Sequence, residues 1–179
     1  MSLRESRPFQ RMSAYDTRAL RWVLTRPGRA RLGRAARYCS RLGDGPAYVI
    51  LGLVLFYMEP VNGPLFFVQA LAAFLLELPL YISLKHAIRR RRPADLEETL
   101  SALIQPSDRF SFPSGHSAAA FLMATLVAIH YPVWALVAYP LAFAIGASRV
   151  VLGVHYPTDI VAGAVLGGSC AALIIPLIN

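Results

Sequence analysis

The chain has 179 residues, of which 56% are hydrophobic, and its formal net charge is +8. This length allows a single domain. The hydrophobic share is well above that of soluble domains and falls in long runs, so a soluble globular protein is disfavoured and a bilayer protein is indicated.

The first 45 residues are rich in arginine and contain no compact apolar stretch, so we expect no cleavable signal peptide. Leu, Trp and Ala are interleaved with Arg over residues 14–26 and 29–42, and Pro27-Gly28 separates the two stretches. This pattern predicts one or two amphipathic helices on an anionic membrane surface. A nucleic-acid-binding arm is the alternative, which we disfavour because the segment leads directly into an apolar span. Residues 1–45 are therefore predicted to be an amphipathic interfacial segment.

Five apolar runs follow, and most of them approach the roughly 20 residues that a helix needs to cross a bilayer. They cover about residues 46–58, 65–84, 114–131, 133–152 and 158–178. Lipid offers no hydrogen-bond partners to an open sheet edge, and the runs are too long for barrel strands. The sequence predicts an all-α, polytopic transmembrane helix bundle over residues 46–179, with about five spans and a count of six left open.

Several residues in or beside these spans predict local contacts. Asp44 is expected to cap the first span. Glu77 lies inside the second, where a carboxylate is costly, and either supports a cationic site or accepts a hydrogen bond from a neighbouring helix. Gly163 and Gly167 share one face of the last span and predict close helix packing within the chain. The two cysteines, Cys39 and Cys170, are expected near opposite membrane faces as packing residues rather than as a disulfide.

The positive charges indicate an orientation. Of the 18 lysines and arginines, 11 precede residue 42, and the others are Lys85, the run Arg89 to Arg92, Arg109 and Arg149. None lies in the connections near residues 59–64 or 131–133, so with five spans every cation is on one face. The positive-inside rule makes this face cytoplasmic. We expect a multi-pass protein of the inner (plasma) membrane whose charged face is the cytoplasmic one.

The first candidate motif ends the second span, where Lys85 is followed seven residues later by Arg92 and Pro93. If the helix continues, this spacing is two turns and places both cations on one side. A basic helix end is the simpler explanation, because the helix dipole and the lipid headgroups favour cations there. We accept it for residues 89–91 and expect little effect from changing Arg90, whereas we interpret Lys85 and Arg92 as phosphate ligands.

The second motif, Pro113-Ser114-Gly115-His116, opens the third span. Proline suits a first helical turn, glycine lets the backbone approach a ligand, and the free N–H groups of a helix start bind phosphate oxygens. His116 is placed to give a proton to a leaving oxygen. Taken alone, the tetrapeptide is better explained as an ordinary capped helix start.

The third motif contains Ser148-Arg149 at the end of the fourth span and His155 with Asp159 before the fifth. We expect the carboxylate to accept an N–H from the ring, which fixes the tautomer and raises the nucleophilicity of the other nitrogen. A histidine–aspartate pair that caps a helix is the alternative. It does not explain why an arginine and a second histidine recur on the same face.

Together, the three stretches resemble the type-2 phosphatidic acid phosphatase (PAP2) family, whose pattern is K-x6-RP, PSGH and SR-x5-H-x3-D. The chain matches every motif position between residues 85 and 159. The surrounding spans are similar to those of the family's membrane lipid-phosphatase branch, rather than to its soluble acid phosphatases. Many members have six spans and an outward-facing site, whereas this chain has about five, so we expect a site that faces the cytoplasm.

The resemblance implies the role of each residue. His155 attacks phosphorus and becomes a phosphohistidine, Asp159 orients it, and His116 protonates the leaving oxygen and later activates water. The non-bridging oxygens are held by five further residues: Lys85, Arg92, Ser114, Gly115 and Arg149.

The resemblance also implies a metal-independent hydrolase that needs no cofactor. The expected partners are the bilayer and a lipid phosphate, with no nucleic acid. Phosphatidylglycerol phosphate, phosphatidic acid and undecaprenyl diphosphate all fit a phosphate group held above a buried lipid tail. A vanadate-dependent haloperoxidase-like enzyme and a non-catalytic lipid-phosphate binding or transport protein are the alternatives.

Overall fold

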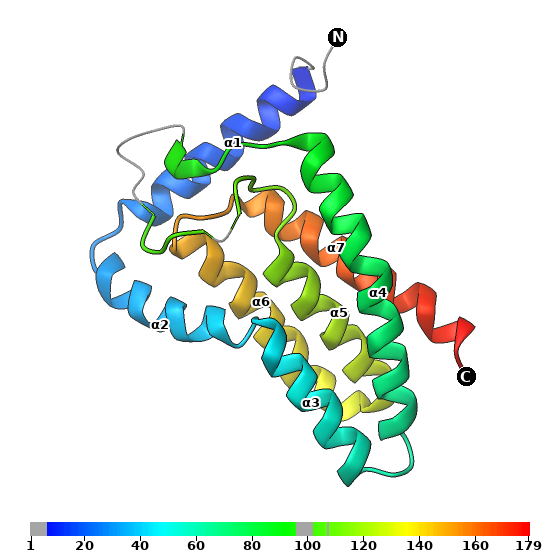
Figure 1. The fold of residues 1–179 in the computed structure, drawn as a ribbon. Helices are drawn as coiled ribbons and strands as arrows, with labels where there is room; N and C mark the ends of the chain where they lie inside the picture. Colours follow the sequence, from blue (N-terminus) through cyan, green and yellow to red (C-terminus); the bar gives the residue numbers. More distant parts are fainter. Residues whose placement is uncertain (1–6, 96–101, 107) are drawn as a thin grey trace.

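The computed structural model describes residues 7–95, 102–106 and 108–179, and this part of the chain is helical. Its seven α-helices are α1 (Arg7–Leu24), α2 (Arg29–Arg41), α3 (Gly45–Met58), α4 (Gly63–Ile88), α5 (Gly115–His130), α6 (Ala135–Val151) and α7 (Pro157–Ile174) (Figure 1). Single 3-10 turns occupy Pro93–Asp95, Pro132–Trp134 and Ile175–Leu177. Apart from one isolated β-bridge between Arg91 and Phe110, no strand pairing occurs among the described residues. The predicted all-α class is confirmed.

The five predicted apolar runs correspond to helices α3 to α7. Helix α5 is at the centre and contacts α4, α6 and α7, while α3 packs against α4 (Figure 1). The main core cluster comprises Phe66, Ala70, Ala73, Leu122, Met123, Leu126, Cys170 and Ala171. Small residues in this cluster bring the helices close together around α5.

The contact between α5 and α7 depends on the glycines of α7. A Cβ atom built on Gly163 would lie 2.3 Å from the carbonyl oxygen of Ser114, and one on Gly167 would lie 1.9 Å from that of Ala118. No side chain fits in either place, so the two glycines let the helix backbones touch. The structure thus gives the predicted glycine face a partner within the chain.

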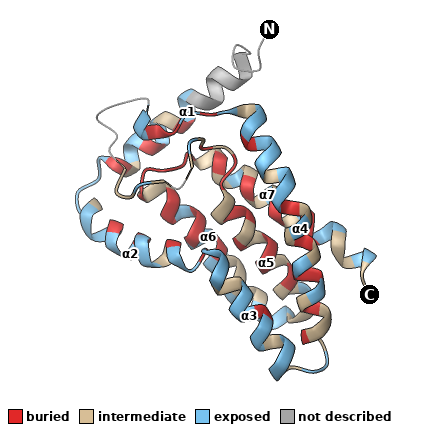
Figure 2. Cartoon of the chain, viewed as in Figure 1, coloured by how far each residue is buried: buried red, intermediate tan, exposed pale blue. Residues whose placement is uncertain are grey.

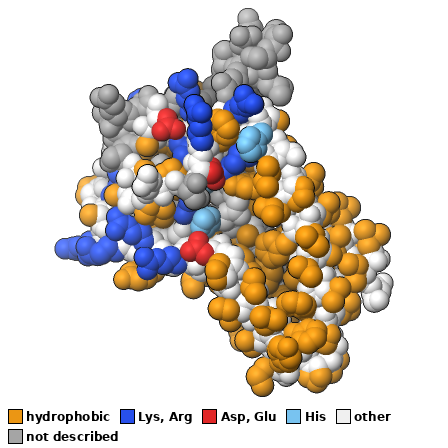
Figure 3. Space-filling model, viewed as in Figure 1, with side chains coloured by type: hydrophobic (Ala, Val, Ile, Leu, Met, Phe, Trp, Pro, Cys, Tyr) orange, Lys and Arg blue, Asp and Glu red, His pale blue; other side chains and the backbone are white. Residues whose placement is uncertain are grey.

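The outer surface of the bundle is apolar. Large hydrophobic side chains on its outside are exposed to the surroundings, among them Ile50, Leu75, Leu136 and Val165 (Figures 2 and 3). Three segments are long and apolar enough to cross a bilayer: Gly63–Ile88, Pro132–Val151 and Pro157–Leu177. Helices α2 and α3 form a pair bent by 46°, and α5 is a shorter apolar helix. The chain is a membrane helix bundle, and the count of five spans stays a prediction.

The two amphipathic stretches at the amino terminus form two helices. They are separated at Gly28, whose φ of 84° is in the left-handed region that glycine tolerates. Helix α1 contacts α6 and α7, and α2 contacts α6, at the end of the bundle where the lysines and arginines gather (Figures 1 and 3). The arrangement of these helices on a lipid surface stays a prediction.

One expectation about the helices is wrong. Helix α4 ends at Ile88, because Arg89 adopts a left-handed conformation with φ 49°. Residues 90–92 then lie outside any helix, and Pro93 disfavours helical geometry at Arg92. Lys85 and Arg92 are therefore not two turns apart on one helix, although they meet in space, as described below.

Glu77 is buried in α4, and its carboxylate forms no hydrogen bond or salt bridge with any described residue. The hydrogen bond expected from a neighbouring helix is therefore not formed by the described residues, and support of the cationic site stays a prediction.

Candidate active site

The predicted motif residues come together at the charged end of the bundle. They are contributed by the end of α4 and the segment that follows it, the start of α5, the end of α6, the α6–α7 connection and the first turn of α7. Two loop segments, the one that follows α4 and the one that precedes α5, lie side by side at this end. Arg91 pairs with Phe110 in a β-bridge, and the Ser111 amide donates a hydrogen bond to the Arg90 carbonyl at 2.9 Å.

His155 lies in the α6–α7 connection with 2% of its surface exposed. Its Nδ1 lies 2.8 Å from the carbonyl oxygen of Ser111. A carbonyl only accepts hydrogen bonds, so Nδ1 carries the hydrogen and the lone pair of the neutral ring is on Nε2. Burial lowers the pKa of His155 to about 4, which keeps the ring neutral at pH 7.

Asp159 is close to His155 but does not accept the hydrogen bond that the spacing predicted. Its Oδ2 lies 3.6 Å from Nδ1 of His155, which is an electrostatic contact rather than a direct hydrogen bond. That oxygen instead accepts from the Tyr156 amide at 2.8 Å. The Ser111 carbonyl thus fixes the tautomer, and the Asp159 carboxylate adds negative charge beside the ring.

Arg90 holds the other oxygen of Asp159, and the expectation that Arg90 is only part of a basic helix end is wrong. Its Nη1 donates to Asp159 Oδ1 at 2.8 Å, and its Nη2 donates to Asp16 Oδ2 in α1 at 2.6 Å. The guanidinium also lies 4.0 Å from the centre of the Tyr156 ring. Because α4 ends at Ile88, the Arg90 side chain points toward Asp159 and Asp16 and does not continue the surface of the helix.

Lys85 and Arg92 meet at the carboxylate of Asp108. Lys85 Nζ donates to Asp108 Oδ2 at 2.7 Å, and Arg92 Nη2 donates to Asp108 Oδ1 at 2.7 Å. Arg92 also donates to the Val154 carbonyl at 2.6 Å and to the Asp108 carbonyl at 2.9 Å, while Lys85 also donates to the Tyr81 hydroxyl. Burial acts to raise the pKa of Asp108, but its contacts with Lys85 and Arg92 outweigh this and keep that pKa below its ordinary value. The two cations therefore converge on one anionic group.

Arg149, at the end of α6, is buried next to the same region. Its Nη1 donates to the Ser40 hydroxyl at 2.6 Å, and its Nε is buried without a hydrogen-bond partner among the described residues. An unpaired buried donor is costly. This guanidinium therefore retains a donor that an anionic ligand can satisfy.

His116 is in the first turn of α5, where Nε2 lies 3.0 Å from Asp44 Oδ1. Asp44 precedes α3 but makes no side-chain capping hydrogen bond, so its expected capping role is wrong. The carboxylate contacts His116 instead. His116, Asp44, Arg149 and Ser40 line a pocket of about 260 Å³.

Ser114 and Gly115 shape the start of α5. Ser114 is fully buried, and its hydroxyl accepts a hydrogen bond from the Ser117 amide at 3.4 Å as the helix cap. A Cβ on Gly115 would lie 3.1 Å from the Tyr81 ring, so a larger residue would press against that ring.

Sequence reasoning missed four residues that contact motif side chains, namely Ser40, Tyr81, Asp108 and Ser111. It also missed Asp16, which reaches Asp159 through Arg90, and it assigned other roles to Arg90 and Asp44. None of these residues belongs to a motif, and a pattern of spacings carries no signal for such contacts. Among the described residues, no group of three or more His, Cys, Asp or Glu side chains is arranged to hold a metal ion.

Comparison with known proteins places this geometry in a family. A model of the PAP2 superfamily matches residues 64–179. The chain is 34% identical over 141 residues to the decaprenylphosphoryl-5-phosphoribose phosphatase of Mycolicibacterium smegmatis. The aligned residues make up 76% of this chain and 73% of that protein.

Two solved structures have similar folds. LpxE of Aquifex aeolicus superposes with a TM-score of 0.79 at 27% identity, covering 98% of this chain and 99% of that one. The first transmembrane PAP2-type phosphatidylglycerolphosphate phosphatase from Bacillus subtilis gives a TM-score of 0.72 at 28% identity, covering 97% and 88% of the two chains. With the motifs, the fold and the family match in agreement, the chain belongs to the PAP2 superfamily.

Proposed function

We propose that this membrane protein is a lipid phosphatase that works through a phosphohistidine at His155. The observation that carries the proposal is the state of His155, which is buried, neutral at pH 7 and hydrogen-bonded through Nδ1 to the Ser111 carbonyl. Such a ring has its Nε2 lone pair available for attack. A purely structural histidine–aspartate pair has no need of the cationic side chains around it.

In the first step, His155 Nε2 attacks phosphorus and the bond from phosphorus to the leaving oxygen breaks. His116 gives its proton to that oxygen. The ring of His155 becomes positively charged as the new bond forms, and the Asp159 carboxylate, 3.6 Å from Nδ1, stabilises that charge. The Ser111 carbonyl keeps its hydrogen bond with Nδ1 throughout.

The phosphoryl oxygens are held by cations at the site. Lys85 and Arg92, which here converge on Asp108, and the unpaired Nε of Arg149 supply positive charge where negative charge develops. Ser114 and the Gly115 amide stand at the start of α5, where backbone N–H groups and the helix dipole favour an anion.

In the second step, water attacks the phosphohistidine. His116, now neutral, takes a proton from this water as the bond between Nε2 and phosphorus breaks. Inorganic phosphate leaves, and both histidines return to their starting states. No step in this scheme uses a metal ion.

The substrate is a lipid whose tail stays in the bilayer while its phosphate enters the polar end of the bundle. Phosphatidylglycerol phosphate, phosphatidic acid and undecaprenyl diphosphate all have this form. Two relatives are phosphatases of decaprenylphosphoryl-5-phosphoribose and of phosphatidylglycerolphosphate, and these activities support this class. We place the protein in a bacterial inner membrane with the site at the cytoplasmic face, because the cations gather there.

The test is phosphate release by detergent-purified protein from this panel of lipid phosphates, with EDTA present. The proposal predicts release from at least one lipid that is insensitive to EDTA and abolished in His155→Ala. A haloperoxidase-like enzyme would instead oxidise halide after vanadate is added. A binding or transport protein would retain the lipid without releasing phosphate.

A further inference from the structure

The four arginines that follow α4, residues 89–92, alternate between buried and exposed side chains. Arg90 and Arg92 are 6% and 3% exposed, whereas Arg89 and Arg91 are exposed. Arg89 has left-handed geometry, and from Arg90 to Arg92 the chain lies outside any helix with Arg91 paired to Phe110 in a β-bridge, so successive side chains there point in opposite directions. The inner pair reaches Asp159 and Asp108, so the outer pair is left without a role in the proposed reaction.

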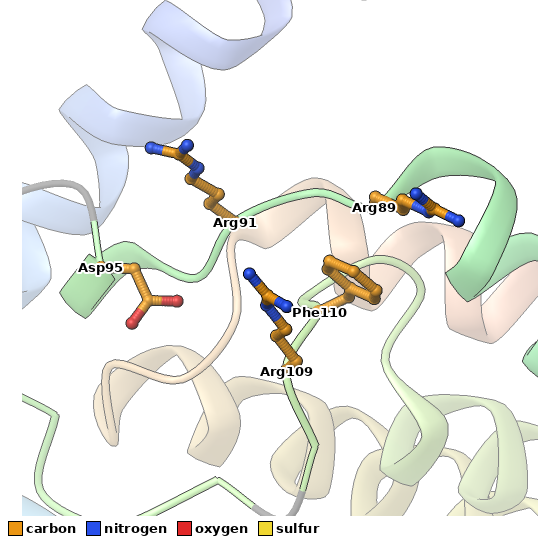
Figure 4. Close-up of a pocket in the computed structure, with 5 residues that line it drawn as sticks. All are labelled: Arg89, Arg91, Asp95, Arg109 and Phe110. Atoms are coloured by element: carbon orange, nitrogen blue, oxygen red, sulfur yellow. The ribbon is translucent and has the colours of Figure 1, made fainter.

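The outer side carries a pocket of about 560 Å³, lined by Arg89, Arg91, Asp95, Arg109 and Phe110 (Figure 4). Arg89 and Arg91 come from the segment after α4, and Arg109 and Phe110 come from the segment that faces it across the β-bridge. The guanidinium carbon of Arg109 lies 5.8 Å from the centre of the Phe110 ring. Three arginines and one aspartate leave an excess of two positive charges around this pocket.

No carboxylate of a described residue forms a salt bridge with Arg91 or Arg109. Guanidinium groups bind phosphate oxygens with paired hydrogen bonds, and they are more weakly hydrated than ammonium groups, which favours such contacts. The pocket therefore has the chemistry of a phosphate-binding site.

Its position relates it to the active site without making it part of that site. The Ser111 amide donates to the Arg90 carbonyl at 2.9 Å, and the Ser111 carbonyl accepts from His155 at 2.8 Å. The two loop segments thus separate the arginine pocket on one side from the nucleophile on the other. Both sites are at the charged end of the bundle, where lipid headgroups would meet the protein.

We propose that the pocket formed by Arg89, Arg91, Arg109, Asp95 and Phe110 is a second anion site, which binds the phosphate of an anionic lipid headgroup. Inorganic phosphate offers the same chemistry, so the two sources must be separated by experiment. The site is distinct from the reaction centre, so binding of an anion to it can be measured without an activity assay.

Native mass spectrometry in a neutral detergent measures that occupancy. The double variant Arg91→Gln with Arg109→Gln is titrated with phosphatidylglycerol, phosphatidylcholine or inorganic phosphate. The matched control, Arg31→Gln with Arg34→Gln, removes two exposed charges from α2. Turnover of p-nitrophenyl phosphate shows that both double variants are folded, because none of these arginines contacts the proposed reaction centre.

We expect the pocket variant to bind phosphatidylglycerol about tenfold more weakly than the wild type, while phosphatidylcholine binding is unchanged and the control variant keeps its affinity. A loss confined to inorganic phosphate assigns the site to the free anion. Unchanged binding of both anions, or an equal loss in the two double variants, overturns the proposal.

A second inference concerns helix α1 and rests on different contacts. Asp16 of α1 is 3% exposed and receives hydrogen bonds from Arg90 Nη2 at 2.6 Å and from the Thr158 amide at 3.1 Å. The Thr158 hydroxyl donates to Asp16 and accepts from Arg90 Nη1, the latter at 2.8 Å. Arg90 thus connects the carboxylate of α1 to Asp159.

We infer that Asp16 and Arg90 are positioning residues for Asp159, so that the amino-terminal helix completes the active site. With Arg90 removed, Asp159 Oδ1 loses its charged partner and the carboxylate is free to turn away from His155. With Asp16 removed, Arg90 keeps one carboxylate instead of two. Both changes act on the attack by His155 rather than on lipid binding.

The test compares Arg90→Gln with Arg91→Gln, two adjacent arginines on opposite sides of the chain. The burst of p-nitrophenol from p-nitrophenyl phosphate gives the rate of phosphoenzyme formation, and its amplitude counts the competent molecules. We expect Arg90→Gln to slow the burst at least tenfold with KM unchanged, Asp16→Asn to slow it less, and Arg91→Gln to leave it unchanged. A reduced amplitude at an unchanged rate, or equal rates in both arginine variants, refutes the inference.

Discussion

The Asp44 carboxylate lies 3.0 Å from Nε2 of His116, although 72 positions separate them in the chain. Asp44 belongs to the turn between α2 and α3, and His116 belongs to the first turn of α5. Burial and the charge of Arg149 lower the pKa of His116, whereas the Asp44 carboxylate opposes this shift and favours the imidazolium form that a general acid needs. The turn at the end of the amino-terminal segment therefore supports the residue that protonates the leaving oxygen.

This relationship predicts that Asp44→Asn is sensitive to the leaving group. An alkoxide from a lipid needs a proton to depart, whereas p-nitrophenolate leaves without one. We expect kcat to fall about tenfold or more with a lipid phosphate and to change little with p-nitrophenyl phosphate. Parallel steady-state assays with the two substrates measure this. A similar loss with both substrates would contradict a role in leaving-group protonation.

The buried His155 predicts a particular loss of stability in acid. Its pKa is lowered by burial to about 4, from an ordinary value of 6.5, so between these values the unfolded chain binds a proton that the folded chain does not. The free energy of unfolding is therefore unaffected by this group above pH 6.5. It decreases as the pH falls toward 4, by up to about 3 kcal/mol. Melting in detergent from pH 7 to 4.5 should show a steeper decline in the wild type than in His155→Gln. Parallel curves for the two proteins would refute the assignment.

Asp108 predicts an effect on inhibition by the product. Its carboxylate contacts Lys85 and Arg92 at 2.7 Å and therefore competes with any phosphate for the same two cations. In Asp108→Asn the competing charge is absent, and we expect inorganic phosphate to inhibit about tenfold more strongly. Glu59→Gln, which removes a carboxylate from the connection between α3 and α4 at the other end of the bundle, is the control. Weaker or unchanged phosphate inhibition in Asp108→Asn would show that Asp108 supports phosphate binding instead.

The contact between α5 and α7 predicts opposite outcomes for two adjacent glycines. An alanine at Gly167 would place its Cβ 1.9 Å from the Ala118 carbonyl oxygen, whereas at Gly168 the nearest atom is the Thr125 hydroxyl oxygen at 3.6 Å. Gly167→Ala should force the helices apart and lower the melting temperature by several degrees, because overpacking costs about 1–3 kcal/mol. Gly168→Ala should be neutral or slightly stabilising, since alanine favours a helix. Equal melting temperatures would contradict the close packing.

The parts of the fold that could be predicted are those encoded locally. Apolar runs identified α3 to α7, and the break at Pro27-Gly28 separated α1 from α2. Motif spacing also identified His116, His155 and Asp159 as candidates, because each is next to a helix end. These features depend on neighbours in the chain and are therefore visible in the sequence.

The contacts that hold the site in place could not be predicted in the same way. The Ser111 carbonyl, which fixes the tautomer of His155, is a backbone atom 44 positions away. Asp16 and Asp159 meet through Arg90 only because the chain leaves helical geometry at Arg89. The interpretation of residues 89–91 as a basic helix end therefore missed the buried contacts of Arg90. Such contacts depend on tertiary packing, which no local pattern records.

The most direct test of the proposed chemistry is the identity of the phosphorylated residue. Purified protein is mixed with a lipid phosphate in the presence of EDTA, quenched rapidly in alkali to preserve phosphohistidine, and mapped by mass spectrometry. We predict phosphate on His155 in the wild type, and no phosphoenzyme and no phosphate release in His155→Ala. Phosphate on a different residue, or full turnover by His155→Ala, would contradict the account.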